Sequence, residues 1–274
     1  MRLLTLRLNG ATRAVRQDND ILTEIGGFTD VGMLLREENW EQIARAASGV
    51  QHALVGADLE AVIPNPSKIL CVGLNYRTHI LEMGRALPEF PTLFAKYAET
   101  LTGPYDNVEL PDEDEAIDWE AELAVVIGKT GRRISEADAG DYIAGYTVCN
   151  DISMRTWQFR TKEWLQGKIW EKSTPLGPAL VTKDEFTPGA IIRTKVDGAT
   201  MQEAPTGDLL FTPEYLVSYI STMITLNPGD VIITGTPGGV GRARKPEVYL
   251  TNGQVLETSI QGIGGLKNRL VAAS

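Results

Sequence analysis

Two glutamates separated by one residue lie in an apolar stretch that the sequence predicts to be a strand. Residues 117–128 end in Val125-Val126-Ile127-Gly128, a strand-favouring run closed by a glycine. Because alternate side chains of a strand point to one face, we expect Glu120 and Glu122 to point the same way, with Cα atoms about 6 to 7 Å apart. Two such anions raise one another's pKa unless a positive charge lies between them. The spacing therefore favours a bound divalent cation.

A third carboxylate, Asp151, ends a second predicted strand, residues 142–149. Two neighbouring strands can thus bring three carboxylates to one point. A site made of oxygen ligands alone suits Mg²⁺ or Mn²⁺, whereas zinc normally recruits His or Cys. The alternative is that Glu120 and Glu122 lie on an exposed, solvated strand face. Their apolar neighbours favour the metal site, because a buried carboxylate needs a partner.

A short predicted helix carries a histidine and a glutamate. It begins after the turn at Gly73 and ends at Gly84. His79 and Glu82 are three residues apart and therefore share a helix face. The carboxylate can then orient the imidazole as a general base. The alternative is a surface pair with no chemical role.

Two cations follow Asp151 in the chain. Arg155 and Lys168 are candidates to bind a substrate carboxylate or a developing oxyanion. For Lys168 the alternative is an ordinary surface lysine. The glycines of residues 234–241 permit a close backbone approach to a ligand. A phosphate-binding loop is disfavoured there, because no Gly-Lys-Ser/Thr ends the segment and no clear helix follows it.

The composition is that of an ordinary globular protein. The chain has 274 residues, 43% of them hydrophobic and 23% charged. Its net charge of -10 argues against nucleic acid or an anionic membrane as a partner. There is neither a long apolar run nor a signal-peptide pattern, so we expect a cytoplasmic protein. The two cysteines, Cys71 and Cys149, lie in apolar runs and are expected to be core thiols.

Pro64-Asn65-Pro66 marks a predicted junction between two units. Residues 1–62 read as a small N-terminal domain, with a hairpin turn at Asn9-Gly10 and helix caps at Asp30 and Asn39. Residues 63–274 then form the catalytic domain. Strands do not alternate regularly with long helices, which argues against a doubly wound sheet.

Several motifs together resemble the fumarylacetoacetate hydrolase family, and the resemblance covers roughly residues 64 to 270. The motifs are Gly73-Leu74-Asn75-Tyr76-Arg77-x-His79-x-x-Glu82, Trp119-Glu120-Ala121-Glu122-Leu123-Ala124-Val125-Val126-Ile127-Gly128, Gly145-Tyr146-Thr147-Val148-x-Asn150-Asp151, Gly167-Lys168, Pro175-Leu176-Gly177-Pro178 and Thr234-Gly235-Thr236-Pro237. The resemblance implies an α+β, mostly β fold of rolled sheets and a homodimer.

The resemblance also implies roles for individual residues. Mg²⁺ or Mn²⁺ would be held by the three acids, His79 and Glu82 would act as a dyad, and Lys168 would stabilise an oxyanion. The residues expected to contact the oxo-acid substrate are Tyr76, Arg155, Gln158 and Thr236. The segment Ile169-Trp170-Glu171-Lys172 departs from the family pattern, so Trp170 and Lys172 are expected to reshape the pocket wall. Thr78 also stands where an Asp often precedes the histidine.

The main functional hypothesis is a metal-dependent hydrolase that cleaves a C–C bond in a 1,3-diketo acid of the acylpyruvate or fumarylpyruvate type. His79 would activate water, and the ion and Lys168 would stabilise the leaving enolate. The alternative uses the same site for oxaloacetate decarboxylation, or for tautomerisation or hydration of an oxo acid. A third hypothesis is a non-catalytic module that binds a metal and an oxo acid.

Overall fold

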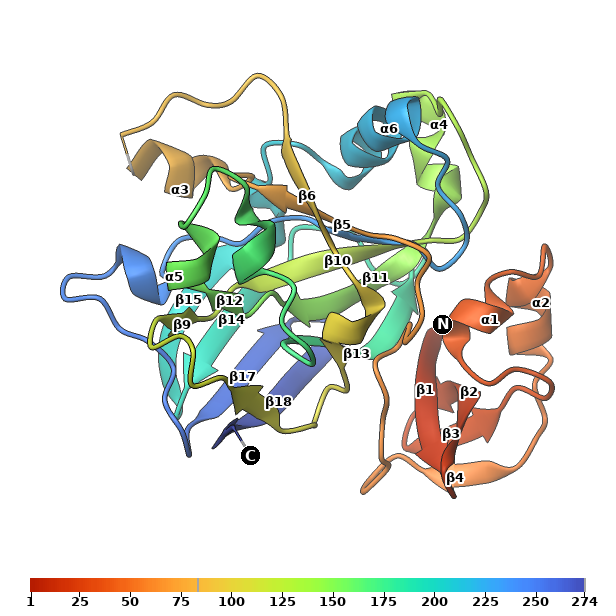
Figure 1. Cartoon of the computed structure of the whole chain (residues 1–274). Coiled ribbons are helices and arrows are strands. Elements are labelled where there is room, and N and C mark those ends of the chain that lie inside the picture. Colours follow the sequence, from red (N-terminus) through yellow and green to blue (C-terminus); the bar gives the residue numbers. More distant parts are fainter. Residues whose placement is uncertain (83, 274) are drawn as a thin grey trace.

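The computed structural model describes residues 1–82 and 84–273, with the side chain of Glu82 outside that description (Figure 1). Strands dominate the described chain and form a long mixed sheet, a second sheet and a two-stranded ladder. The predicted α+β, mostly β fold is confirmed.

The long sheet runs through the whole molecule. Its strands, in spatial order, are β4 Gln51–Ala53, β3 Ile21–Glu24, β2 Ala11–Asp18, β1 Arg2–Leu8, β13 Thr174–Thr182, β11 Ile143–Asn150, β10 Ala121–Ile127, β16 Val231–Ile233, β5 Ile69–Gly73 and β6 Thr92–Lys96, with β7 Leu101–Thr102 beside β13. The second sheet contains β15 Ala199–Pro205, β14 Ile191–Val196, β17 Val255–Ile260, β18 Gly264–Ala272 and β8 Val108–Leu110. The ladder pairs β9 Ile117–Asp118 with β12 Ser153–Met154.

Short helices connect the strands. The α-helices are α1 Val31–Leu34, α2 Trp40–Arg45, α3 Arg77–Glu82, α4 Glu136–Ala139, α5 Arg155–Gln158 and α6 Pro213–Met223. The 3₁₀ turns are η1 Ala98–Thr100, η2 Gly140–Tyr142, η3 Trp164–Gly167, η4 Thr206–Asp208 and η5 Gly241–Ala243. Helix α6 begins where the Thr212 hydroxyl accepts a hydrogen bond from the Tyr215 amide, and Pro213 follows this cap as the first helical residue.

The first 62 residues build four strands and two helices, as the local turn and cap residues dictate. Asn9 and Gly10 both have positive φ and join β1 to β2, which confirms the predicted turn. Asp30 caps α1, because its carboxylate accepts the Met33 amide at 2.8 Å. Asn39 takes the N-cap position of α2, as predicted, but its side chain makes no capping hydrogen bond.

This N-terminal unit shares a sheet with the rest of the chain. Strand β1 pairs with β13, with Arg2 opposite Val181. The Arg7 guanidinium also reaches across to the Asp106 carboxylate at 2.7 Å. The N-terminal strands and the catalytic strands are therefore continuous through β1 and β13.

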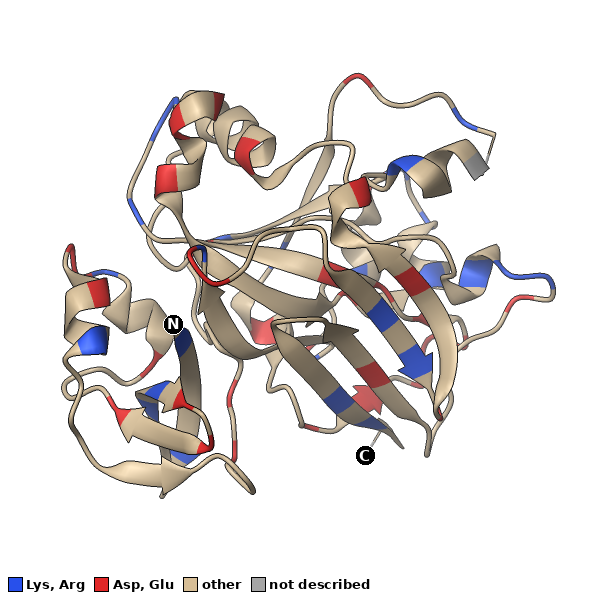
Figure 2. Ribbon diagram, turned by 180° about the vertical axis from the view of Figure 1, so that it is seen from behind, with Lys and Arg blue, Asp and Glu red and all other residues tan. Residues whose placement is uncertain are grey.

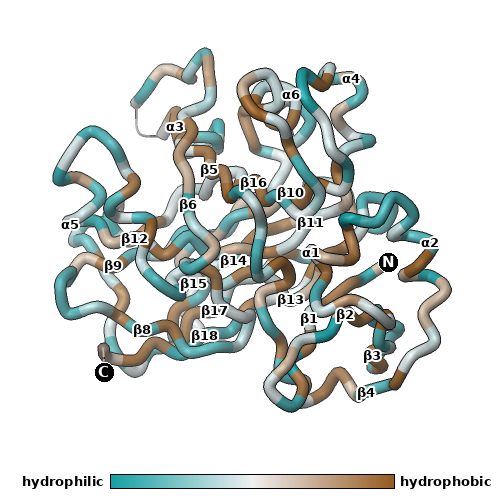
Figure 3. Tube along the Cα trace, turned by 45° about the vertical axis from the view of Figure 1, so that its right-hand side comes forward, coloured by the Kyte–Doolittle hydropathy of each residue, from teal (hydrophilic) through white to brown (hydrophobic). Residues whose placement is uncertain are grey.

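The centre of the long sheet is buried on both faces. Strands β10, β11 and β13 are buried along their whole length, and Figure 3 shows hydrophobic residues following the central strands while hydrophilic ones follow the loops. By contrast, β14 and β17 alternate between buried and half-buried positions, and Figure 2 shows charged residues along the strands at the lower edge of the molecule. The central strands thus provide a rigid, dry support for any side chain at their ends.

Both cysteines are buried and unbridged, which confirms the expectation of core thiols. Within the described residues, no helix is both long and apolar enough to cross a bilayer.

Candidate active site

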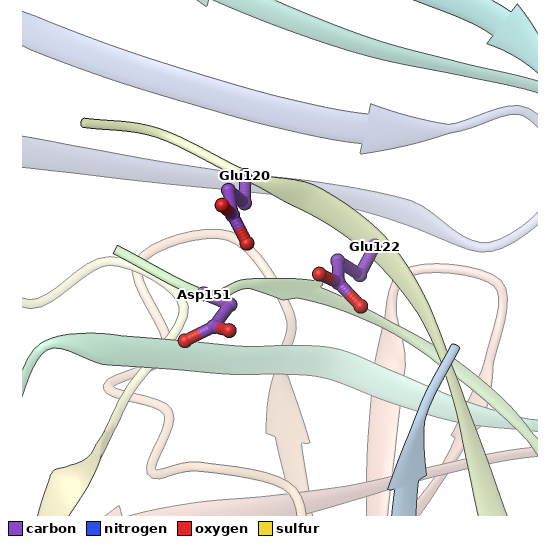
Figure 4. Close-up of side chains that lie close together, drawn as sticks. All are labelled: Glu120, Glu122 and Asp151. Atoms are coloured by element: carbon purple, nitrogen blue, oxygen red, sulfur yellow. The ribbon is translucent and has the colours of Figure 1, made fainter. Parts of the chain in front are cut away.

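Three carboxylates converge at one end of the paired strands β10 and β11. Glu122 lies in β10 opposite Cys149, Glu120 directly precedes that strand, and Asp151 directly follows β11. The Asp151 amide donates to the Glu120 carbonyl at 2.8 Å, which fixes the two strand ends against each other. Oxygen atoms of the three carboxylates lie within 4.8 Å of one another, and all three residues are buried (Figure 4). The structure therefore brings the three predicted acids together.

The predicted strand over residues 117–128 is interrupted just before this point. β9 ends at Asp118 and β10 begins at Ala121. The Asp118 carboxylate accepts the Trp119 amide at 2.8 Å, a local bond that draws the chain out of the regular ladder. The Glu120 amide instead donates to the side-chain oxygen of Asn150 at 3.0 Å. This break turns the Glu120 side chain toward Asp151.

Two buried lysines hold the Asp151 carboxylate. Lys96 Nζ lies 2.7 Å from Oδ1 and Lys168 Nζ lies 2.8 Å from Oδ2. Burial alone would raise the pKa of Asp151, but these two charges outweigh it and lower the pKa. Lys96 also donates to the Lys168 backbone carbonyl, so it fixes the position of the second lysine.

Lys168 joins two of the three acids. Its Nζ lies 2.7 Å from Glu120 Oε2 as well as 2.8 Å from Asp151. Burial opposes its charge, but the two carboxylates raise its pKa, so it remains an ammonium group at neutral pH. Gly167 makes this position possible, because a Cβ there would lie 2.5 Å from the Cβ of Gln158. The structure thus excludes the surface-lysine alternative.

Arg155 forms a second bridge within the site. One Nη lies 2.6 Å from Glu120 Oε1, and the other lies 2.8 Å from Asp118 Oδ2. The guanidinium also donates to the side-chain oxygen of Gln158 at 2.8 Å. Burial opposes the charge of Arg155, and the two carboxylates again raise its pKa. Arg155 therefore orients the carboxylate of Glu120, a predicted metal ligand.

Glu122 differs from the other two acids, because within the described residues its carboxylate has no ion pair. It accepts a hydrogen bond from the Gly235 amide. Gly235 has φ of +101°, and a Cβ there would lie 2.9 Å from the Val72 carbonyl, so glycine is required. Burial, followed by the charges of Asp151 and Glu120, raises the pKa of Glu122 well above its ordinary value.

The charges and donor set fit a divalent cation. The four acids of the site are Asp118, Glu120, Glu122 and Asp151, and its three cations are Lys96, Arg155 and Lys168. The site is therefore one positive charge short of neutrality when all are ionised. A carboxylate offers about four lone-pair sites, so Glu120 and Asp151 can bind an ion while keeping their present partners. An all-oxygen donor set suits Mg²⁺ or Mn²⁺.

A cavity of about 310 Å³ opens onto Glu120 and Glu122, and Asp151 lies behind its wall. Its volume is that of a small-molecule site. The described residues that line it are Val72, Gly73, Leu74, His79, Arg85, Phe94, Glu120, Glu122, Arg155, Gln158, Phe159, Trp164, Lys168, Thr236, Val240, Arg242 and Ala243. Five of the predicted site residues outside the acids are therefore on its wall: His79, Arg155, Gln158, Lys168 and Thr236.

Thr236, Tyr76 and the predicted dyad differ in position. Thr236 lines the cavity, with its hydroxyl donating to the Ala121 carbonyl at 2.9 Å. Tyr76 is not on the described wall but packs in the hydrophobic core, where its hydroxyl has no hydrogen-bond partner among the residues that the structure describes. The His79–Glu82 dyad stays a prediction, because the Glu82 side chain lies outside the described part of the chain.

The segment after Lys168 does not form the cavity wall, contrary to the sequence expectation. Trp170 packs edge-on against Trp157, with ring centroids 5.3 Å apart. Phe159 and Trp164 take the aromatic positions on the wall instead.

Sequence reasoning gives no role to Lys96 or Asp118, although both contribute to the site. Lys96 closes the apolar strand β6, and a lysine in such a position is a signal for a buried ion pair. Asp118 lies in the same apolar stretch as the two glutamates. Its carboxylate holds Arg155 and the backbone of residues 241–242, which are too distant in sequence to be associated with it by pattern.

The comparisons with known proteins agree with this arrangement. The family model described as "Fumarylacetoacetate (FAA) hydrolase C-terminal" matches residues 68–271. The chain belongs to this family. The fumarylacetoacetate hydrolase resemblance inferred from the motifs is thereby confirmed, and the matched residues contain all three acids and the whole described cavity wall.

Similar members of the fumarylacetoacetate hydrolase family carry several different activity names. Oxaloacetate tautomerase fahd2, mitochondrial, of Xenopus laevis is 45% identical over 227 residues, which cover 81% of this chain and 71% of the relative. Oxaloacetate tautomerase Fahd2a, mitochondrial, of Rattus norvegicus is 41% identical over 249 residues, or 89% and 80% of the two chains. These names favour the alternative hypothesis over C–C hydrolysis. They also name mitochondrial proteins, so a cytoplasmic location stays a prediction here.

Two solved structures of the family show the same fold over their full length. Fumarylacetoacetate hydrolase from Exiguobacterium antarcticum has 32% identity and a TM-score of 0.84, with 100% of both chains covered. The 5-carboxymethyl-2-hydroxymuconate delta-isomerase from Mycobacterium smegmatis has 32% identity, a TM-score of 0.84 and the same coverage. The family fold thus supports both hydrolase and isomerase names.

Proposed function

We propose that this chain catalyses keto–enol tautomerisation of a 2-oxo acid of the oxaloacetate type, with a divalent cation held by Glu120, Glu122 and Asp151. The observation that carries the proposal is the convergence of these three buried carboxylates beside a small cavity, whose floor contains Glu120 and Glu122 and whose wall contains Lys168 and His79. The names of the relatives at 41% and 45% identity support the choice of reaction.

The residues around the cavity divide the work of such a reaction. A divalent cation, when bound, supplies a Lewis acid that draws electron density from the 2-oxo carbonyl. Lys168 is an ammonium group fixed by two acids, so its charge stabilises the enolate oxygen without reorganisation. His79, on the cavity wall, takes the proton from the carbon next to the carbonyl, and return of that proton to the enolate oxygen gives the enol and regenerates the neutral imidazole.

Charge at the floor of the cavity favours an acidic substrate. The site is one positive charge short when it is empty and has one in excess when a divalent cation is bound. That excess matches the carboxylate next to the 2-oxo group. Arg155 is occupied by Asp118 and Glu120, so it acts by fixing Glu120 and not by releasing its guanidinium to substrate.

Hydrolysis of an acylpyruvate is the second candidate, because the Exiguobacterium antarcticum structure with full coverage is named a fumarylacetoacetate hydrolase. It needs an additional step, in which water attacks a second carbonyl. Tautomerisation needs proton transfer alone and therefore makes fewer demands on the same residues. Both reactions pass through an enolate, which the cation and Lys168 would stabilise.

The test follows the absorbance of the oxaloacetate enol with Mg²⁺, with EDTA, and in the variants His79→Ala and His52→Ala. His52 is the chain's other histidine and pairs with Glu24 in the N-terminal unit, 2.7 Å away, so its loss is a matched control. We expect EDTA and His79→Ala to lower the rate at least about 100-fold, and His52→Ala to leave it unchanged.

Three other results would each reject the proposal. Full activity in EDTA would remove the metal from the mechanism. Turnover of acylpyruvates without acceleration of oxaloacetate tautomerisation would identify the hydrolase. Saturable binding of oxalate with Mg²⁺, but no turnover of any oxo acid, would identify a binding module.

A further inference from the structure

The outer part of the active-site cavity carries positive charge that the reaction at its floor does not use. Arg242 and Arg85 line the cavity, and both residues are exposed. Within residues 1–82 and 84–273, neither guanidinium lies in an ion pair, whereas the inner cations Arg155 and Lys168 are each held by two acids. The arginines at the mouth of the cavity are thus available to bind an anion, whereas the cations at its floor are already paired with acids.

Arg242 is positioned from the same carboxylate that organises the floor. Asp118 accepts the Arg242 amide at 3.0 Å and the Gly241 amide at 2.7 Å, which anchors η5. The same carboxylate pairs with Arg155, which in turn pairs with Glu120. The backbone of Arg242 is therefore linked to the predicted metal ligand Glu120 through three consecutive contacts, by way of Asp118 and Arg155.

The head of the Arg242 side chain is also held. Its guanidinium carbon lies 4.0 Å from the centroid of the Phe159 ring, which lines the same cavity. An aromatic ring under a guanidinium occupies the face of the group and leaves the N–H donors at its edge available. Those donors form a planar fork that matches a carboxylate. Arg242 is thus fixed at both ends while its hydrogen-bond donors remain open.

We propose that Arg242 binds the second carboxylate of a dicarboxylic 2-oxo acid and makes the enzyme selective for diacids over monoacids, with Arg85 adding positive charge to the same mouth. This inference rests on the proposed function, in which the first carboxylate and the 2-oxo group lie at the floor of the cavity. Glu120, Glu122 and Lys168 at the floor and Arg242 at the mouth line one cavity of about 310 Å³. A small oxo diacid in this cavity would place one anionic group at the floor and the other toward Arg242.

The experiment compares two ligands of equal chain length with Mg²⁺ present: oxaloacetate, a diacid, and 2-oxobutanoate, a monoacid. The KM for oxaloacetate and the inhibition constant for 2-oxobutanoate are measured in the wild type, Arg242→Met, Arg242→Lys and Arg160→Met. Arg160 is the matched control, because its guanidinium also lies over an aromatic ring, 3.4 Å from the centroid of Trp157, but outside the described cavity wall.

We expect Arg242→Met to raise the KM for oxaloacetate about 10-fold to 100-fold and to leave the inhibition constant for 2-oxobutanoate within about twofold, since one charge-assisted carboxylate contact is lost. Arg242→Lys should recover part of the loss, and Arg160→Met should match the wild type. The dissociation constant of Mn²⁺, measured by calorimetry, should be unchanged in all variants, which shows that the floor is intact.

The inference is overturned if Arg242→Met weakens both ligands equally, or neither. It is also overturned if the loss of oxaloacetate binding is accompanied by a loss of Mn²⁺ affinity, because Arg242 would then act through the floor. In these cases the wild type still tautomerises oxaloacetate, so the proposed function survives. A wild type that neither binds nor converts any 2-oxo acid rejects both.

Discussion

Substituting Glu122 by glutamine tests two opposing effects on the stability of the folded state. Repulsion among the three carboxylates lowers that stability, and binding of a cation raises it. Glutamine has the same shape and keeps an oxygen that can accept the Gly235 amide, so the fold around it is retained. Within 4.8 Å, two unit charges repel by at least about 3 kcal/mol at an effective dielectric constant of about 20. Glu122 has no ion pair among the described residues to offset that repulsion, as its raised pKa indicates. The metal-free variant should therefore unfold no more easily than the metal-free wild type.

With a bound cation, the wild type should be more stable than the variant. A ligand that binds only the folded state stabilises it by about 2.7 kcal/mol at a hundredfold excess over its dissociation constant. For a chain of this size each kcal/mol corresponds to roughly 2–4 °C in Tm, so Mg²⁺ or Mn²⁺ should raise the Tm of the wild type by about 5–10 °C. Glu122→Gln removes one of three anionic ligands and should lose most of that rise.

The assay is a thermal unfolding curve with EDTA and with increasing Mn²⁺. Glu115→Gln is the matched control, because it makes the same charge change at an exposed loop position and should keep the full response. Two results would refute the reasoning: a wild-type Tm indifferent to both ions, or a Glu122→Gln protein that keeps the whole metal-dependent rise. A crystal soaked in Mn²⁺ should show an anomalous peak between the three carboxylates.

Two further predictions concern other buried charges. Lys96→Met leaves Asp151 with one cation and should destabilise the metal-free protein by about 3–5 kcal/mol in urea unfolding, whereas Lys162→Met at an exposed position should not; an unchanged midpoint for Lys96→Met would contradict the assigned pair. Asp106 is half-buried, which opposes its charge, yet hydrogen bonds from Arg7 and Gly103 lower its pKa below the ordinary 3.8. Its stabilisation should be fully present above that ordinary value and lost as pH falls through the lower folded pKa, so Asp106→Asn should flatten the acid limb of a stability–pH curve.

The sequence predicts the site better than it predicts the chain around the site. Glu120, Glu122 and Asp151 could be found because they interrupt apolar runs at a spacing that strand geometry converts into one direction. Lys96 could have been recognised by the same argument, as a charge closing an apolar strand. The role of Asp118 could not, because its partners at residues 241–242 lie far away in sequence and are brought near only by the fold.

Other differences follow from packing. Tyr76 belongs to a sequence motif, but its ring is large and apolar enough to be buried in the core beside the cavity. Trp170 was expected on the pocket wall because it departs from the family pattern, yet its best partner is another indole, Trp157. A residue that belongs to a motif can be expected to lie near the active site. Tertiary packing decides whether its side chain faces the cavity.

The pairing of β1 with β13 has a consequence for how the chain can be divided. Pro64-Asn65-Pro66 resembles a domain boundary, but a cut there would expose the backbone donors and acceptors of β13 that Arg2 and Leu3 now satisfy. A bare apolar strand edge is a template for another chain. The first 62 residues therefore cover the edge of β13 within the same chain. A fragment without them would expose this edge and would tend to pair with a second copy of itself.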